Sequence, residues 1–103
     1  MKFRFVAKEK FEKMPKAPGV YALNAGREIL YIGKAANLRE RVKNHFNKSS
    51  WRDNLFVDKV TRAGWLETES EIEALLLSHL ILLLLVLLDT FSVANSTSTG
   101  MAL

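Results

Sequence analysis

The chain has 103 residues, the size of one small domain that can just bury a single core. It contains no cysteine, which excludes disulfides and thiolate metal sites. A chain without cysteine fits a reducing compartment, and the start Met1-Lys2-Phe3-Arg4 lacks the apolar run of a signal peptide. We therefore expect a cytoplasmic protein.

The net charge of +4 conceals a strong asymmetry along the chain. All 15 Lys and Arg residues lie in residues 1–62, where six acids leave a charge of +9. Residues 63–103 carry five acids and no basic residue, a charge of −5. A small segment this basic favours binding to a polyanion, although lysines scattered over a solvated surface remain an alternative.

The first half of the chain predicts a short helix followed by a β-hairpin. We expect the helix around Lys8–Lys13, because Pro15 and Pro18 prevent its continuation. Gly19–Leu23 and Glu28–Lys34 are rich in Val, Ile, Tyr and Leu and predict two strands.

The hairpin loop decides where the two tyrosines point. A three-residue loop, Asn24-Ala25-Gly26, pairs Tyr21 with Ile29 and Gly19 with Tyr31. In that register Tyr21 and Tyr31 project from the same face of the sheet, whereas a two-residue loop would place them on opposite faces.

A basic amphipathic helix follows, from Leu38 to Asn47, with Asn37 as its N-cap. Its apolar stripe consists of Leu38, Val42, His45 and Phe46. Arg41 lies about 60° from Leu38, on the border of the stripe, and is the arginine best placed to reach the sheet. Arg39 and Lys43 point outward, toward solvent or phosphate.

The second half of the chain predicts a polar loop, a third strand and a long apolar helix. The loop covers Lys48–Asp53, and Phe56–Thr68 has strand character. Thr68 and Glu71 have the spacing of a capping box. From Ala74 to Leu88 every residue is apolar except Ser78 and His79. Residues 89–103 are rich in Ser and Thr, and we expect a poorly ordered tail there.

The apolar run Ala74–Leu88 invites comparison with a membrane anchor. Its 15 residues make about 22 Å of helix, short of the roughly 20 residues that a bilayer core requires. Glu73 and Asp89 bracket it, and no Lys or Arg flanks it. We therefore favour a buried or self-associating helix over a membrane span.

The central stretch resembles the GIY-YIG nuclease domain. The matching residues are Gly19-Val20-Tyr21, then Tyr31-Ile32-Gly33-Lys34, then Leu38-x-x-Arg41. The segment Thr68–Leu77 is similar to the N-terminal nuclease domain of excinuclease C, so the resemblance covers roughly residues 14–77. It implies an α+β fold, which the strands and helices above describe as a three-stranded antiparallel sheet flanked by helices, and a nuclease domain over residues 1–88.

The resemblance also implies a chemistry. The family cleaves DNA phosphodiesters with one divalent metal, Mg²⁺ or Mn²⁺, so Tyr31 would help to activate the attacking water, with Tyr21 and Lys34 in support. Arg41 would stabilise the charge that develops on the phosphate, since preorganised cations lower such a barrier most. Gly33 would let the strand end approach the substrate without a Cβ, and Arg39 and Lys43 would bind phosphate. Each of these side chains also has an ordinary structural interpretation, and only their joint spacing favours the functional one.

The chain departs from the family after Leu77. The family's metal-binding glutamate falls at Ser78, either by substitution or by deletion of one residue, and a serine hydroxyl is a poor sole anchor for Mg²⁺. Glu71 lies on the same helix face but two turns away, roughly 10.5 Å. The basic segment with a Tyr-Asn pair that follows in the family is absent.

These departures indicate a truncated, frame-shifted or engineered inactive excinuclease-like domain, which translating the coding DNA in the other frames would test. We expect an endonuclease domain of the nucleotide-excision-repair type, impaired by the missing glutamate. The alternatives are a non-catalytic DNA-binding module and a membrane-associated nuclease fragment. DNA and, by resemblance, the damage-recognition subunits of an excision system are the expected partners, together with self-association through Ala74–Leu88.

Overall fold

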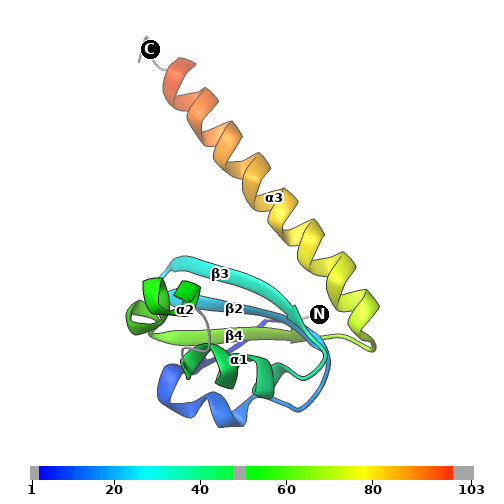
Figure 1. Ribbon diagram of the computed structural model, residues 1–103. Coiled ribbons are helices and arrows are strands. Elements are labelled where there is room, and N and C mark those ends of the chain that lie inside the picture. Colours follow the sequence, from blue (N-terminus) through cyan, green and yellow to red (C-terminus); the bar gives the residue numbers. More distant parts are fainter. Residues whose placement is uncertain (1–2, 48–50, 99–103) are drawn as a thin grey trace.

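A computed structural model describes residues 3–47 and 51–98 as a four-stranded antiparallel sheet with helices on both faces (Figure 1). The strand order is β1-β4-β2-β3, so β3 forms one edge of the sheet. The elements, in chain order, are β1 (Arg4–Ala7), the 3₁₀ helix η1 (Lys8–Lys13), β2 (Gly19–Ala25), β3 (Glu28–Ala35), α1 (Leu38–Phe46), α2 (Trp51–Phe56), the 3₁₀ helix η2 (Val57–Lys59), β4 (Arg62–Glu67) and α3 (Glu71–Ser98).

The α+β class is confirmed, and the sheet has four strands rather than three. The additional strand, β1, pairs with β4, with Phe5 opposite Gly64. It is a short edge strand flanked by charged residues. Its alternation of apolar and polar side chains is too brief for the sequence to predict a strand there. The expected third strand is narrower than Phe56–Thr68, because α2 and η2 occupy Trp51–Lys59 and only Arg62–Glu67 forms β4.

The strands of the β2–β3 hairpin pair in a different register from the predicted one, but Tyr21 and Tyr31 still lie on the same face of the sheet. The loop has two residues, Gly26 and Arg27, and Gly26 adopts a positive φ of 60°. Such a loop alone would place Tyr21 and Tyr31 on opposite faces. A β-bulge between Leu23 and Asn24 shifts the pairing by one residue, so that Leu23 faces Tyr31 and Tyr21 faces Gly33. The bulge restores both tyrosines to one face.

Helix α1 covers the tyrosine face of the sheet. The Asn37 side chain accepts a hydrogen bond from the Glu40 backbone N–H, so the predicted N-cap is confirmed. Leu38 and Val42 are fully buried against the sheet. The core on this side consists of Met14, Tyr21, Leu23, Ala35, Leu38, Val42, Val60, Ala63 and Trp65.

Helix α3 packs with its first turns against β2 and β3, and its later turns extend beyond the domain (Figure 1). Ser70, not Thr68, caps its start: the Ser70 hydroxyl accepts from the Glu73 N–H, while Thr68 donates to the Ser70 carbonyl. Ser70 and Glu73 have the same spacing as the predicted pair, which is why the sequence pattern could not separate them.

Helix α3 extends beyond the apolar run, further than we expected. We predicted a poorly ordered tail from residue 89, but the backbone is helical through Ser98, and residues 99–103 lie outside the described residues. Between Glu71 and Leu88 the helix is long and apolar enough to span a membrane, with only 11% of that window buried in the domain. Length and composition alone support that interpretation, and a core helix would satisfy them too.

Candidate functional site: a pocket across the edge strand

A pocket of about 580 Å³ lies across the edge strand β3, between α1 and the first turns of α3. Its volume is within the range typical of ligand sites. It is lined by Tyr21, Tyr31, Ile32, Gly33, Lys34, Ala35, Ala36, Asn37, Glu40, Arg41, Asn44, Glu71, Leu75, Ser78, His79 and Leu82. The structure thus brings together five of the predicted site residues and the position of the missing carboxylate.

The two tyrosines form one wall of the pocket. Their rings stack with centroids 5.9 Å apart and planes 18° apart, and Tyr21 is fully buried whereas Tyr31 is half-buried. A Cβ at Gly33 would lie 2.6 Å from the Tyr21 hydroxyl and 2.9 Å from Cε1 of Tyr31. We expected the missing side chain of Gly33 to make room for substrate. The tyrosine rings occupy that space instead, so Gly33 is needed to seat them.

Behind the tyrosine wall lies a buried hydrogen-bond chain that the sequence did not predict. The Tyr21 hydroxyl lies 2.7 Å from Nε2 of His45, and Nδ1 of His45 lies 2.7 Å from Oδ1 of Asp53. All three side chains are buried. His45 was assigned to the apolar stripe of its helix, which is correct, but Asp53 was assigned to a loop. It is in α2, and its hydrogen bond with His45 joins α2 to α1.

Arg41 is exposed on α1 and reaches the Tyr21 hydroxyl, as its position on the border of the stripe predicted. Hydrogen bonding to Tyr21 raises the pKa of the Arg41 guanidinium, which therefore stays cationic in the pocket. Burial raises the pKa of Tyr21, and Arg41 opposes this only in part. Tyr21 is thus a neutral phenol at neutral pH, held beside a permanent cation.

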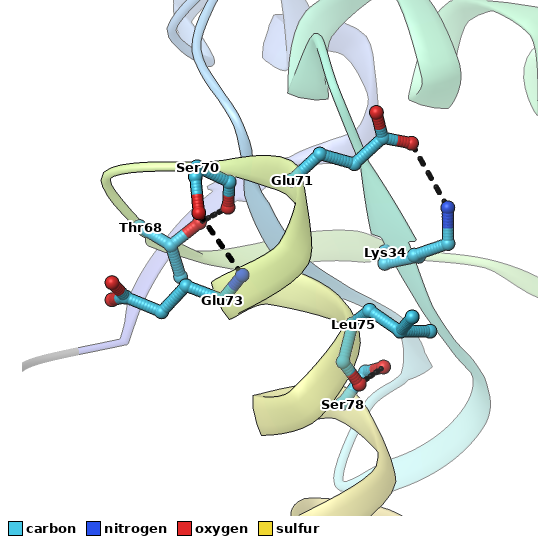
Figure 2. Close-up of polar contacts among 7 residues, drawn as sticks. All are labelled: Lys34, Thr68, Ser70, Glu71, Glu73, Leu75 and Ser78. Carbon is cyan, nitrogen blue, oxygen red and sulfur yellow. Dashed lines mark hydrogen bonds and ion pairs between the residues drawn. The ribbon is translucent and has the colours of Figure 1, made fainter.

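Lys34 enters the pocket from the opposite face of β3. Side chains alternate along a strand, so Lys34 projects away from Tyr31 and Gly33 and toward α3. Its Nζ lies 2.9 Å from Oε1 of Glu71, an ion pair that spans the gap between β3 and α3 (Figure 2). Glu71 thus neutralises the lysine in the free protein, and both side chains remain partly exposed.

Arg39 and Lys43 do not line the pocket. The Nε of Arg39 donates a hydrogen bond of 2.8 Å to the Met14 carbonyl, which ties α1 to the segment before β2. Lys43 is exposed on α1. A role in phosphate binding stays a prediction for both residues, and for Arg39 it would require breaking this contact.

Comparison with known proteins settles the family. Residues 17–83 match the family of UvrC-like GIY-YIG domains. The chain belongs to this family. The match covers the hairpin, α1 and the first turns of α3, which supply the lining of the pocket.

The relatives are much longer proteins. UvrABC system protein C of Borrelia duttonii is 46% identical over 71 residues, which are 67% of this chain and 12% of the relative. That of Thermus thermophilus is 41% identical over 64 residues, 62% of this chain and 11% of the relative. This GIY-YIG domain therefore spans about an eighth of the curated relatives that it matches.

A solved structure has the same fold. It is the GIY-YIG N-terminal endonuclease domain of UvrC from Thermotoga maritima, bound to its catalytic divalent cation, magnesium. The TM-score is 0.65 with 24% sequence identity, over 72% of this chain and 83% of that one. The likeness establishes the fold of the four-stranded sheet and its helices.

The residues of this GIY-YIG domain do not fit a divalent metal. Ser78 is buried, and its hydroxyl donates a hydrogen bond of 2.8 Å to the Leu75 carbonyl, one turn back along α3 (Figure 2). Glu71 is engaged by Lys34. Among the side chains that the structure describes, no group of three His, Asp or Glu residues is placed to hold a metal ion. Mg²⁺ is usually bound through one or two carboxylates, and the pocket, although Glu40 and Glu71 line it, has none at position 78, where the family places its metal anchor.

Proposed function

We propose that this chain is a DNA endonuclease domain of the nucleotide-excision-repair type whose cleavage is impaired because Ser78 replaces a metal-binding glutamate. The observation that carries the proposal is the convergence of Tyr21, Tyr31, Lys34 and Arg41 on one pocket that α3 closes at Ser78. Their joint spacing in the sequence is that of the family, and the relatives belong to the UvrABC system.

Each residue has a role that its geometry permits. Arg41 is a permanent cation at the pocket, suited to hold a phosphate and to stabilise the charge that accumulates on it. Lys34 supplies a second cation once a phosphate competes with Glu71 for it. Tyr31, half-buried at the pocket wall, would orient a water molecule toward the phosphorus. In a complete family member the divalent metal, Mg²⁺ or Mn²⁺, would supply further charge stabilisation.

The test is nicking of supercoiled plasmid in the presence of Mg²⁺ or Mn²⁺. We expect little or no nicking by the chain itself and a gain of nicking in Ser78→Glu. Leu76→Glu is the matched control, because it adds the same charge to the same helix at an exposed position outside the pocket. Nicking by Ser78→Glu should be lost again when Tyr31→Phe or Arg41→Ala is added. If Ser78→Glu leaves nicking at the control level, the impaired-nuclease proposal fails.

A second candidate is a DNA-binding module without catalysis. The lack of a metal cluster among the described residues and the +9 charge of residues 1–62 favour it. Retardation of DNA without nicking, in both the chain and Ser78→Glu, would support this candidate. Salt dependence does not separate the two, since both bind phosphate.

The partners follow from the same proposal. DNA is the substrate, and the damage-recognition subunits of an excision system would direct the domain to it, in the cytoplasm. The exposed leucines of α3, among them Leu83, Leu84 and Leu87, are suited to self-association, because a helix that is apolar all round must be covered. A membrane-bound fragment is the competing explanation, and carbonate extraction separates them: a self-associating protein stays in the soluble fraction.

A further inference from the structure

The buried chain behind the tyrosine wall has a direction that the chemistry of its members fixes. Asp53 lies 2.7 Å from Nδ1 of His45, and an ionised carboxylate only accepts hydrogen bonds, so Nδ1 carries a proton. At the other end, Arg41 and Tyr21 line the same pocket and interact with each other and with Tyr31. The guanidinium has donors and no acceptor, so in its interaction with Tyr21 the phenol oxygen is the acceptor.

These two ends are satisfied together by one arrangement of the link between them. Tyr21 has one hydroxyl proton, and with Arg41 donating to its oxygen, that proton is available to His45. Nε2 of His45 lies 2.7 Å from the Tyr21 oxygen and accepts this proton when it carries none of its own. The neutral Nδ1–H tautomer satisfies both contacts of the ring at once. In this arrangement Arg41 donates to Tyr21, Tyr21 donates to His45, and His45 donates to Asp53.

The surroundings of His45 leave its ring little freedom to turn. Its centroid lies 4.7 Å from that of Tyr31, in an edge-on arrangement, and 6.1 Å from that of Phe56. His45 and Asp53 are 7% and 3% exposed. Neither residue lines the pocket, so neither can touch a substrate there. A buried and fully satisfied polar chain of this kind fixes orientation.

We infer that His45 and Asp53 are positioning residues that orient the phosphate-binding guanidinium of Arg41 through the hydroxyl of Tyr21. This inference rests on the proposed function, in which Arg41 meets a DNA phosphate. With Asp53 in place, the Tyr21 oxygen presents its lone pairs to the guanidinium. An asparagine at position 53 can donate to Nδ1, which moves the ring proton to Nε2. His45 then donates to Tyr21, and the Tyr21 proton turns toward Arg41, where two donors oppose each other.

The first test determines the tautomer directly by ¹⁵N NMR of the full chain labelled at histidine. We expect His45 to show a protonated Nδ1 and an unprotonated Nε2, with the exposed His79 as the reference imidazole in the same spectrum. In Asp53→Asn the proton should move to Nε2. The inference is overturned if His45 of the unmodified chain is protonated at Nε2 or at both nitrogens. This measurement on the unmodified chain needs no nuclease activity and no variant to fold.

The second test asks whether Asp53 acts through Arg41. Affinity for a short DNA duplex is measured at fixed salt for Asp53→Asn, Arg41→Ala and the double variant. We expect Asp53→Asn to weaken binding at least about threefold in the unmodified background and to have no further effect in Arg41→Ala, a coupling expected of residues in one network. Asp58→Asn, the same change at an exposed position nearby, is the control. Additive losses would show that Asp53 does not act through Arg41.

The two proposals fail separately. If the tautomer and the coupling are as expected but Ser78→Glu does not nick DNA, the endonuclease fails and the positioning inference stands. If Ser78→Glu nicks DNA and the tautomer is the opposite one, the positioning inference alone is wrong.

Discussion

The two walls of the pocket are built from different kinds of sequence. The wall formed by β2, β3 and α1 carries Tyr21, Tyr31 and Arg41, each in contact with a neighbour that fixes its position. The wall formed by α3 presents Glu71, which Lys34 neutralises, and Ser78, whose hydroxyl turns back to its own helix. One wall carries a cation and two tyrosines held in place, and the other offers no free carboxylate to a metal.

The walls differ in packing as strongly as in chemistry. Tyr21, Leu23 and Leu38 are fully buried beside the first wall, whereas the leucines of α3 past Ser78 are mostly exposed. Stability of the domain should therefore depend on the hairpin and α1, and hardly at all on the outer turns of α3.

The largest effect should come from truncating the core of the first wall. Leu23→Ala removes a fully buried side chain and should lower the free energy of unfolding by about 2–5 kcal/mol. Leu83→Ala, at 55% exposure on α3, should change it by about 0.5 kcal/mol or less. Urea denaturation followed by tryptophan fluorescence measures both. Equal losses would contradict the contrast between the walls.

A methyl group at Gly33 should have the next largest effect. Its Cβ would approach the Tyr21 hydroxyl and the Tyr31 ring, which are both held in place, so Gly33→Ala should cost about 1–3 kcal/mol. Gly64→Ala is the matched control: the three atoms nearest to its Cβ would all belong to the Phe5 ring, which is 45% exposed and can move aside. Thermal unfolding should show the smaller loss for Gly64→Ala, and the reverse order would refute the seating role of Gly33.

The ion pair between the walls should contribute little to stability. Lys34 and Glu71 have side chains that are 39% and 53% exposed, and such pairs contribute about 0.2–1 kcal/mol. A double-mutant cycle of Lys34→Met and Glu71→Gln measures the coupling, which should shrink as salt is added. A coupling that is insensitive to salt would show that the pair is not solvent-screened.

The smallest effect at neutral pH concerns Tyr21. Its pKa is raised in the folded protein by burial, so the neutral phenol stabilises the fold below the ordinary tyrosine pKa near 10. That contribution is lost as the pH rises from about 10 through the folded pKa. Unfolding free energies measured between pH 7 and 11 should decline more steeply above pH 10 for the unmodified chain than for Tyr21→Phe. Parallel curves would mean that Tyr21 ionises normally.

Much of the first wall could be predicted from sequence because its signals are local. Asn37 as an N-cap and the stripe of α1 follow from residues close in the chain. The shared face of the tyrosines was predicted from a three-residue loop, but the loop has two residues. A bulge in the β2–β3 pairing, which no residue type indicates, restores the shared face.

What was missed depends on contacts that form only in the folded chain. Asp53 of α2 meets His45 of the preceding helix α1 through side chains alone, and β1 is too short to be predicted before it pairs with β4. The resemblance indicated that Ser78 occupies the position of the metal-binding glutamate. Only the structure shows that its hydroxyl donates a hydrogen bond to the Leu75 carbonyl. Local periodicity predicts elements, whereas the partners of buried polar groups are set by tertiary packing.

Binding of Mn²⁺, followed by electron paramagnetic resonance, tests most directly whether the α3 wall lacks the metal anchor that the wall of β2, β3 and α1 would need. The chain as it stands should bind Mn²⁺ no better than the Leu76→Glu control. Ser78→Glu should bind one ion at least about tenfold more tightly, because it supplies the carboxylate that such cations require. Equal, tight binding of Mn²⁺ by the unmodified chain would contradict the account.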